Sequence, residues 1–227
     1  MRKITSNRQP APMKRGLIPA FLAAVIISVT GLLAPINAAQ AKNTFVFANA
    51  SPYDTMDPQV VFDVGRVAYR LNLYDGLLRW LDNPPKLNPW LAESYDISSD
   101  GKQYTFTLRA NAKFHDGSPV EAKDVAYSID RILALKKGAS SLFVKVIKPG
   151  STKAIDNRTV QFNLNKSSAI FLATVPEIHV MNSDLMKKHE KDGDWASAWV
   201  SKNDAGSGSF KLKRYDPAKG FLAERFA

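Results

Sequence analysis

Histidine, cysteine and paired carboxylates are the usual carriers of acid–base, nucleophilic and metal chemistry, and this sequence offers few of them. It contains three histidines, His115, His179 and His189, and no cysteine. The spacing of these histidines matches no pattern of zinc ligands. The sequence also lacks a G-x-S-x-G nucleophile elbow and a phosphate-binding glycine loop. We therefore expect no catalytic residue, no metal site and no cofactor, and so no enzyme.

His115 and Asp116 are the remaining candidates for chemistry, because an acid stands directly beside a base. In extended backbone, neighbouring side chains point to opposite sides, which is a poor arrangement for a base and the carboxylate that orients it. Gly117 and Pro119 follow, and an Asp-Gly step with a nearby proline is typical of a turn. We predict that Gly117 matters more than His115, and that replacing His115 by alanine leaves the fold nearly untouched.

The first residues have the organisation of a secretory signal peptide. A basic start without acidic residues precedes an apolar run from Leu17 to Leu33, and Ala39 and Ala41 give the small-x-small pattern of a cleavage site. A membrane anchor is the alternative, but the run is near the lower limit for spanning a bilayer. We predict cleavage after Ala41, with no cysteine there to carry a lipid, and therefore a soluble periplasmic protein without stable membrane insertion.

The charge of the chain argues against a nucleic-acid partner. Five basic residues of the predicted signal peptide account for half of the formal charge of +10: Arg2, Lys3, Arg8, Lys14 and Arg15. The remaining charge is mild and includes no dense cluster of lysine and arginine. The absence of cysteine also means that the exported protein needs an ordinary hydrophobic core in place of disulfides.

Patterns of hydrophobicity predict a mixture of helices and strands. Alternation predicts a strand at 44–48, a short strand at 77–81, and a hairpin at 92–109 that turns at Asp100-Gly101. Helical spacing marks residues 60–74, with Gly76 as the stop, and residues 124–133, in a helix that begins near Glu121. Further strands are predicted within 156–164 and 206–215, and mostly polar helix within 185–200. Because regular βαβ alternation is absent, the fold class is mixed α/β, or α+β.

The segment from Leu91 to Ile132, LAESYDISSDGKQYTFTLRANAKFHDGSPVEAKDVAYSIDRI, closely resembles the signature region of the family 5 solute-binding proteins. These are receptors of ABC importers for peptides, nickel, sugars or opines. Further marks occur in the family's order: Met56-Asp57-Pro58, LYDGL at 73–77, DNRTVQFNL at 156–164 and GSGSFKL at 206–212. Two departures are Glu121, where the family often has threonine, and Ser209, where it usually has proline.

The resemblance implies a periplasmic binding protein-like clamshell of type II, of which only the first-lobe portion is present. Within it we expect a signal peptide at 1–41 and a first segment of domain I at 42–85. The small second domain of that lobe would occupy 86–200. The start of the returning, truncated domain I segment would occupy 201–227.

The resemblance also implies a function and a site. The protein would capture a peptide or similar small solute and deliver it to an inner-membrane ABC permease. Carried over by position, the ligand contacts are Phe62, Asp63, Val64 and Phe143. Each has an ordinary alternative, with Phe62 as a core residue and Asp63 as the N-cap of the following helix.

Functions from other classes stay open at this point. An exported hydrolase is disfavoured because the nucleophile, base and metal groups are missing. A structural or chaperone-like periplasmic module, and a truncated fragment that binds nothing, are the alternatives. The sequence does not identify the solute.

Overall fold

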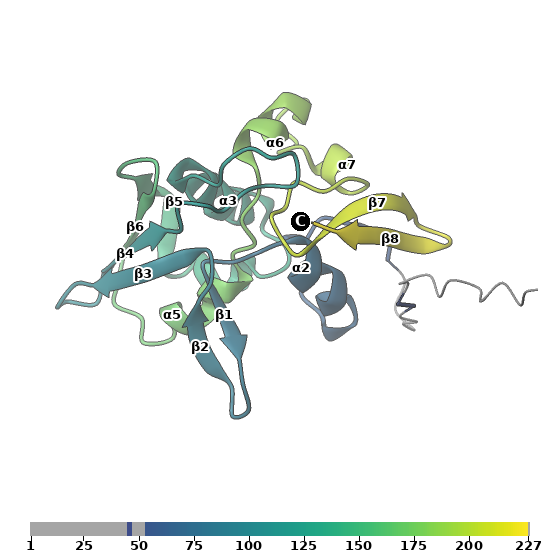
Figure 1. Cartoon of the computed structure of the whole chain (residues 1–227). Coiled ribbons are helices and arrows are strands. Elements are labelled where there is room, and N and C mark those ends of the chain that lie inside the picture. Colours follow the sequence, from purple (N-terminus) through teal and green to yellow (C-terminus); the bar gives the residue numbers. More distant parts are fainter. Residues whose placement is uncertain (1–44, 47–52, 227) are drawn as a thin grey trace, which may run out of the picture. The chain divides into compact units, whose positions relative to one another are not determined.

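The computed structural model of the chain describes residues 45–46 and 53–226. The predicted signal peptide and most of the predicted strand at 44–48 lie outside these residues. The elements from residue 53 to residue 226 belong to one compact unit, and Figure 1 shows their arrangement.

Short helices alternate irregularly with antiparallel strands. The helices are η2 (Val64–Arg66), α2 (Val67–Leu73), α3 (Ala122–Leu135), α4 (Ser140–Phe143), α5 (Phe171–Thr174), η3 (Val175–Glu177), α6 (Ser183–His189) and α7 (Ser197–Val200). The strands are β1 (Leu78–Leu81), β2 (Lys86–Pro89), β3 (Ala92–Ile97), β4 (Gln103–Leu108), β5 (Ile147–Ala154), β6 (Thr159–Leu164), β7 (Phe210–Asp216) and β8 (Gly220–Arg225). The mixed fold class is therefore confirmed.

A four-stranded antiparallel sheet in the order β3-β4-β6-β5 carries the larger hydrophobic core. Alternate residues of β4 and β6 are buried, and Phe106 and Phe162 meet edge to face with ring centroids 5.6 Å apart. Helix α3 packs against β5 and β6 and buries Val125, Ile129 and Ile132. The strand period of two and the helix period of 3.6 thus place apolar side chains in one interior.

A second core lies where α2 meets the β7–β8 hairpin, which are neighbours in Figure 1. Tyr69 and Leu73 of α2 are fully buried in it, and Leu212 and Phe221 of the hairpin pack against it. Gly206 is needed close by, because a Cβ at this position would collide with the carbonyl oxygen of Leu73. The glycine-rich segment before β7 is therefore a place of close backbone approach.

Several predicted elements are confirmed. The hairpin forms as β3 and β4, with Gly101 at φ 66°. Strand β1, helix α3, strand β6 and strand β7 also lie where the patterns placed them. The helix predicted within 185–200 corresponds to α6, which begins two residues earlier at Ser183, and to α7, with Gly193 between them.

The predicted helix at 60–74 is wrong in extent. Regular helix occupies only 67–73, preceded by one 3-10 turn. Gly76 does not end it; α2 ends at Leu73, and the capping residue Tyr74 is extended. A Cβ on Gly76 would lie 2.9 Å from the carbonyl oxygen of Pro176, so close packing accounts for this glycine.

The predicted boundaries at 85/86 and 200/201 stay a prediction. Leu77 and Leu78 pack in the larger core, although they precede residue 86. Tyr127 and Met181, from within 86–200, pack in the smaller core. Hydrophobic contacts therefore cross both boundaries.

The turn predicted after His115 is present in the structure. The Oδ1 atom of Asp116 accepts hydrogen bonds from the backbone N–H of Ser118 at 2.9 Å and from its hydroxyl at 2.6 Å. Gly117 has φ 89°, in the left-handed region that favours glycine.

We expect Gly117→Val to lower the free energy of unfolding by about 1–3 kcal/mol, because a β-branched residue is strained at positive φ. Apart from Gly117 itself and its two chain neighbours, no atom lies within 4 Å of the position that a Cβ would take, so backbone strain alone should cause the loss. Gly117→Asn is the matched control and should cost less, since asparagine tolerates this region better. Chemical denaturation gives the free energy of unfolding of the wild type and of both variants. A valine variant as stable as the wild type would contradict the prediction that the turn requires glycine.

The expectation that His115 is dispensable is wrong. Its Nδ1 atom lies 2.7 Å from Oδ1 of Asp204, and its Nε2 atom lies 2.9 Å from the carbonyl oxygen of Gly208. Its side chain is 8 % exposed. His115 therefore clamps the loop before β7 to the loop before α3.

Candidate ligand-binding face

The loop that precedes α2 presents three of the predicted ligand residues. Phe62 is 50 % exposed and Val64 is 88 % exposed, while Val61 between the loop and the core is buried. The interpretation of Phe62 as a core residue is therefore not supported. Its ring lies instead 6.0 Å from the guanidinium carbon of Arg70, within the range of a cation–π contact.

Asp63 has the capping role that the sequence left open. Its Oδ1 atom accepts a hydrogen bond of 2.9 Å from the backbone N–H of Arg66, and it is the N-cap of η2. The second carboxylate oxygen lies 3.5 Å from the Arg66 guanidinium. The side chain stays 44 % exposed, so a ligand amine can still approach it.

Phe143 lies elsewhere. It belongs to α4 and is fully buried in the larger core. Its side chain has no exposed surface, so it is not part of the proposed ligand surface.

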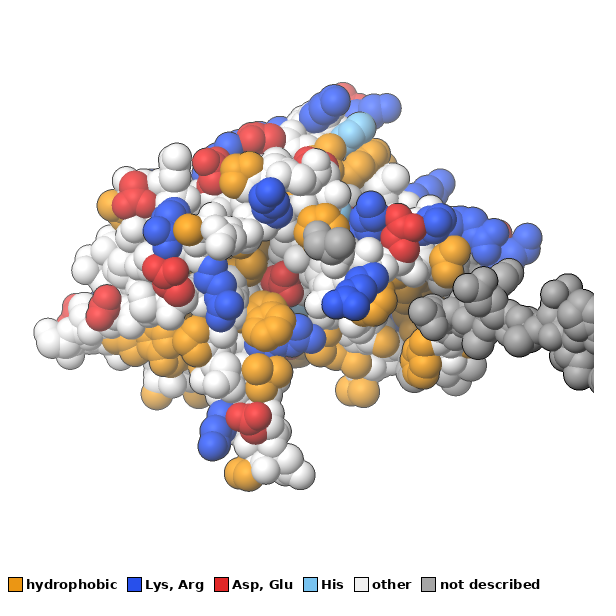
Figure 2. Space-filling view, in the orientation of Figure 1, with side chains coloured by type: hydrophobic (Ala, Val, Ile, Leu, Met, Phe, Trp, Pro, Cys, Tyr) orange, Lys and Arg blue, Asp and Glu red, His pale blue; other side chains and the backbone are white. Residues whose placement is uncertain are grey.

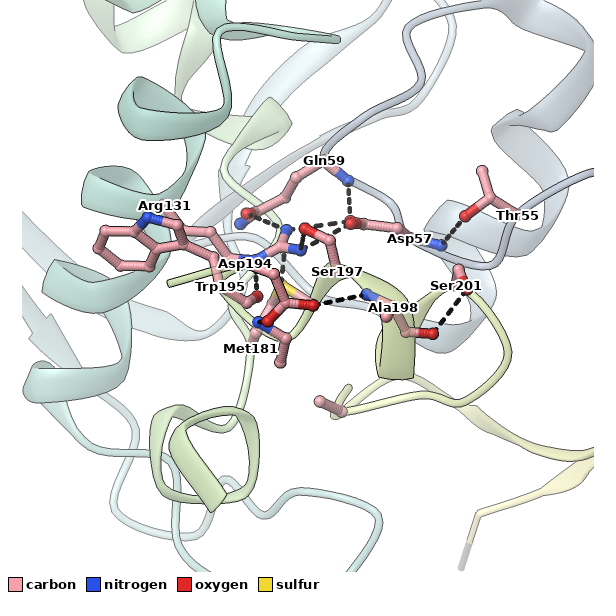
Figure 3. Close-up of polar contacts among 12 residues, drawn as sticks. Thr55, Asp57, Gln59, Arg131, Met181, Asp194, Trp195, Ser197, Ala198 and Ser201 are labelled. Carbon is pink, nitrogen blue, oxygen red and sulfur yellow. Dashed lines mark hydrogen bonds and ion pairs between the residues drawn. The ribbon is translucent and has the colours of Figure 1, made fainter. Parts of the chain in front are cut away.

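A buried polar network holds the base of the loop (Figure 3). Arg131 of α3 is fully buried and makes two hydrogen bonds to the carboxylate of Asp57, at 2.6 and 3.1 Å. Its guanidinium also donates to Oε1 of Gln59 at 3.0 Å and to the carbonyl oxygen of Trp195 at 2.9 Å. The amide of Gln59 then donates to the carbonyl oxygens of Ser128 and His179. The network thus ties the start of the exposed loop to α3 and to the segments around His179 and Trp195.

The patterns considered above did not predict this network, although the sequence of α3 contains a signal for it. Asp124, Ser128 and Arg131 lie at positions i, i+4 and i+7 of one helix, a spacing that places them on one face. All three are buried. A polar stripe on the buried side of an amphipathic helix indicates a paired interior charge.

Next to Phe62 lie three further polar side chains, those of Arg70, Glu177 and His179. Arg70 donates to Oε2 of Glu177 at 2.9 Å, and its Nη1 atom lies 3.3 Å from Nε2 of His179. His179 is 2 % exposed, and burial lowers the pKa of its imidazole to about 3, with the charges of Arg70 and Arg79 adding to the effect. The ring is therefore neutral at physiological pH.

A cavity of about 110 Å³ opens beside these groups. Its lining includes Leu71 and Trp80, both more than one third exposed, as well as Asp75, Trp90 and His179. Burial raises the pKa of Asp75, although hydrogen bonds from Trp90 and Ser207 partly oppose this effect. Figure 2 shows hydrophobic side chains gathered along the lower part of the molecule, where α2 and the β1–β2 hairpin lie.

A larger hollow, of about 310 Å³, lies beside the His115 clamp and β7. Lys202 and Arg214 are among the side chains around it. None of the four predicted ligand residues lines it, so size alone does not make it the site.

The described part of the chain contains neither a cluster of metal ligands nor a helix that could span a membrane. Among residues 45–46 and 53–226, no group of three or more histidine, aspartate or glutamate side chains is placed to hold a metal ion. No helix within these same residues is long and apolar enough to cross a membrane.

Comparison with known proteins decides the family. Residues 86–227 match the model of the bacterial extracellular solute-binding proteins, family 5, middle region. The chain belongs to this family. Because the match begins before the predicted signature hairpin and runs to residue 227, it covers more than half of the sequence.

Curated relatives include peptide-binding proteins of bacteria. The chain is 34% identical over 185 residues to the probable D,D-dipeptide-binding periplasmic protein DdpA of Escherichia coli. This match covers 79% of the chain and 35% of the relative. It is 31% identical over 185 residues to the dipeptide-binding protein DppE of Bacillus subtilis, with 74% of the chain and 33% of the relative covered. The chain thus spans about a third of the length of these relatives.

Solved structures agree on the fold. A substrate-binding domain of an oligopeptide ABC transporter from Bacillus anthracis superposes with a TM-score of 0.67 at 26% identity, covering 82% of the chain and 38% of that structure. The periplasmic binding protein DppA of Helicobacter pylori, solved with the peptide STSA, gives 0.65 at 28% identity, covering 76% and 37%. The predicted periplasmic binding protein-like fold is confirmed.

Proposed function

We propose that this chain is the first-lobe portion of the periplasmic solute-binding component of an ABC importer. It contributes one wall of a binding cleft for a peptide or similar small solute and passes the solute to an inner-membrane permease. It is not an enzyme, and residues 1–41 direct its export and are then removed. Membership of family 5 carries this proposal, because its relatives are named as binding proteins.

The loop at Phe62, Asp63 and Val64 supports the proposal physically. An exposed aromatic and an exposed aliphatic side chain lie on either side of a carboxylate, on a segment fixed from below by the Arg131 network. Such a rigid, partly apolar surface can pack against solute side chains while the carboxylate accepts from an amine. The neighbouring cavity of about 110 Å³ is smaller than a typical ligand pocket, which fits one wall of a cleft better than a whole site.

We expect the 227-residue chain to bind peptides only in the millimolar range. A cleft receptor buries its ligand between two walls, and polar contacts strengthen as water leaves. If the absence of one wall removes about 5 kcal/mol from the binding free energy of a micromolar ligand, the dissociation constant rises by more than a thousandfold. NMR titration with a mixed peptide pool should therefore shift the backbone signals of Phe62 to Val64 at millimolar peptide.

Two variants sharpen this titration. Phe62→Ala should weaken the shifts several-fold, whereas Ile97→Ala, a similarly exposed apolar residue on β3, should leave them unchanged. No perturbation at millimolar peptide, or one confined to the hollow beside β7, would refute the proposal. Micromolar, one-to-one binding would instead contradict the argument that one wall is insufficient.

A further inference from the structure

The loop between α6 and α7 is held in a strained backbone conformation. Four of its residues have φ between 50° and 70°: Asp192, Gly193, Trp195 and Ala196. Residues other than glycine rarely adopt such angles, so further contacts must hold the loop in place. The carboxylate of Asp194 provides them, because it accepts hydrogen bonds of 2.8 to 3.0 Å from the backbone N–H groups of Lys191, Ala196 and Ala198.

Asp192 and Gly193 form the tip of this loop, and both are exposed. The backbone N–H of Asp194 donates to the carbonyl oxygen of Lys191 at 2.9 Å, which closes a turn around them. Among the described residues, neither the Asp192 carboxylate nor the N–H of Gly193 has a hydrogen-bond or ion-pair partner. Apart from Gly193 itself and its two chain neighbours, no atom lies within 4 Å of the position that a Cβ on Gly193 would take. The carboxyl group and the amide that follows it are therefore both free to move.

An aspartate followed by a glycine can rearrange with water as the only reactant. The glycine nitrogen attacks the carbon of the protonated side-chain carboxyl, and a C–N bond forms while the carboxyl OH and the amide hydrogen leave as water. Water then reopens the resulting succinimide ring at either carbonyl. Opening at the main-chain carbonyl gives isoaspartate, in which the backbone runs through the former side chain. Glycine favours ring closure because it has no Cβ to obstruct the approach.

The chain has four Asp-Gly steps, and two of the others are held by their own turns. The carboxylate of Asp100 accepts two hydrogen bonds, and the N–H of the glycine after it donates to the carbonyl oxygen of Ser98 at 2.9 Å. At Asp116 both carboxylate oxygens accept hydrogen bonds, and the next N–H donates to the carbonyl oxygen of Phe114 at 2.8 Å. Ring closure at these two steps requires the hydrogen bonds to break first.

The remaining step, at Asp75 and Gly76, is buried. Burial raises the pKa of Asp75, which favours the protonated carboxyl that ring closure needs. Its two oxygens, however, accept hydrogen bonds from Trp90 and Ser207. A Cβ on Gly76 would already lie 2.9 Å from the carbonyl oxygen of Pro176. Ring closure here would require both the hydrogen bonds and this close packing to be given up.

We propose that Asp192-Gly193 is a site of spontaneous isoaspartate formation, and that this modification releases the loop before α7 from the Arg131 network. The reaction involves no solute, so it does not depend on the proposed function. Isoaspartate lengthens the backbone by one methylene group. The turn closed by Lys191 and Asp194 therefore cannot keep its geometry, and the Asp194 carboxylate is displaced from the N–H groups that donate to it.

Trp195 carries this change to the buried network (Figure 3). It follows Asp194 directly and has φ 55°, a conformation that the Asp194 hydrogen bonds hold from both sides. Its carbonyl oxygen accepts from the Nε–H of Arg131 at 2.9 Å, and the same guanidinium binds Asp57 below the Phe62 loop. Loss of the turn therefore loosens the anchor of that loop.

The test follows the four Asp-Gly steps of the wild-type chain during incubation at neutral pH and physiological temperature. Trypsin places each step on a different peptide, and mass spectrometry with electron-transfer dissociation distinguishes isoaspartate from aspartate. In the folded protein, isoaspartate should form at Asp192 at least about fivefold faster than at the other three steps, which must first open locally. In concentrated urea the four rates should become similar. Equal rates in the folded protein, or no isoaspartate at Asp192, would overturn the site.

A matched variant tests the release of the loop. Asp192→Glu keeps the charge but would need a larger ring, so it should not rearrange. The isoaspartate form of the wild type, separated by chromatography, should exchange the Nε–H proton of Arg131 with water several-fold faster than the fresh protein does, as measured by NMR. Asp192→Glu incubated for the same time should keep the rate of the fresh protein. An unchanged rate in the isoaspartate form would show that the modification does not reach the network, and a faster rate in incubated Asp192→Glu would show that isoaspartate is not its cause.

Discussion

Arg131→Ala should lower the free energy of unfolding by about 3–5 kcal/mol, as expected when one partner of a buried ion pair is removed. Arg131 is fully buried, and the side chain of Asp57, its partner, is 2 % exposed. The variant leaves the Asp57 carboxylate in the interior without its two guanidinium hydrogen bonds, and it also removes the donors to Gln59 and to the Trp195 carbonyl. The loop that carries Phe62 would lose its anchor, so the signals of 62–64 should broaden.

Urea denaturation of matched variants tests this prediction. Arg131→Lys should restore little of the loss, because an ammonium cannot reproduce the planar, bidentate contact with Asp57. Lys213→Ala removes one partner of an exposed ion pair with Glu224, and should cost far less than Arg131→Ala because water screens the pair. If Arg131→Ala and Lys213→Ala were equally stable, the buried network would not support the fold.

His115→Ala should lower the free energy of unfolding by about 2–3 kcal/mol, since a hydrogen bond to a charged group is lost together with one to a carbonyl. The side chain of Asp204 is 7 % exposed and would keep only backbone donors, from Gly206 and Leu212. The Gly208 carbonyl would lose its contact with the imidazole. The segment that leads into β7 would then be held less firmly.

The size of this loss should depend on pH. Burial alone lowers the pKa of His115, but the hydrogen bond and charge of Asp204, together with the Gly208 carbonyl, outweigh it and hold the pKa above its ordinary value. Folding therefore favours the imidazolium. The stabilisation is complete below the pKa of the unfolded chain, about 6.5, and is lost as pH rises through the raised pKa of the folded protein.

The measurement compares wild type and His115→Ala at a series of pH values, because the difference between them isolates His115. The low pKa of His179 acts in the opposite direction and destabilises both proteins as pH falls below about 6.5, so it cancels in the difference. The gap in unfolding free energy should be widest at acidic pH and narrow toward alkaline pH. A gap that widens as pH rises would show that the imidazolium is not the stabilising form.

The sequence by itself determined the elements whose cause is local. Gly101 supplies the positive φ that the β3–β4 hairpin needs, and alternation in β4 and β6 and the helical spacing of α3 assigned the buried faces correctly. The ordered family marks identified the fold class and the family. Asp63 was a recognisable capping residue because an N-cap bonds within its own turn.

Only the tertiary structure decided the features that depend on residues distant in the chain. His115 looked like part of a turn, but its hydrogen-bond partners lie 89 and 93 residues further on. Arg131 is 74 residues from Asp57, and the cavity combines α2, the β1–β2 hairpin and the segment around His179. Periodicity shows which way a side chain faces, whereas the burial of a charge is tolerated only once folding has brought its partner to it.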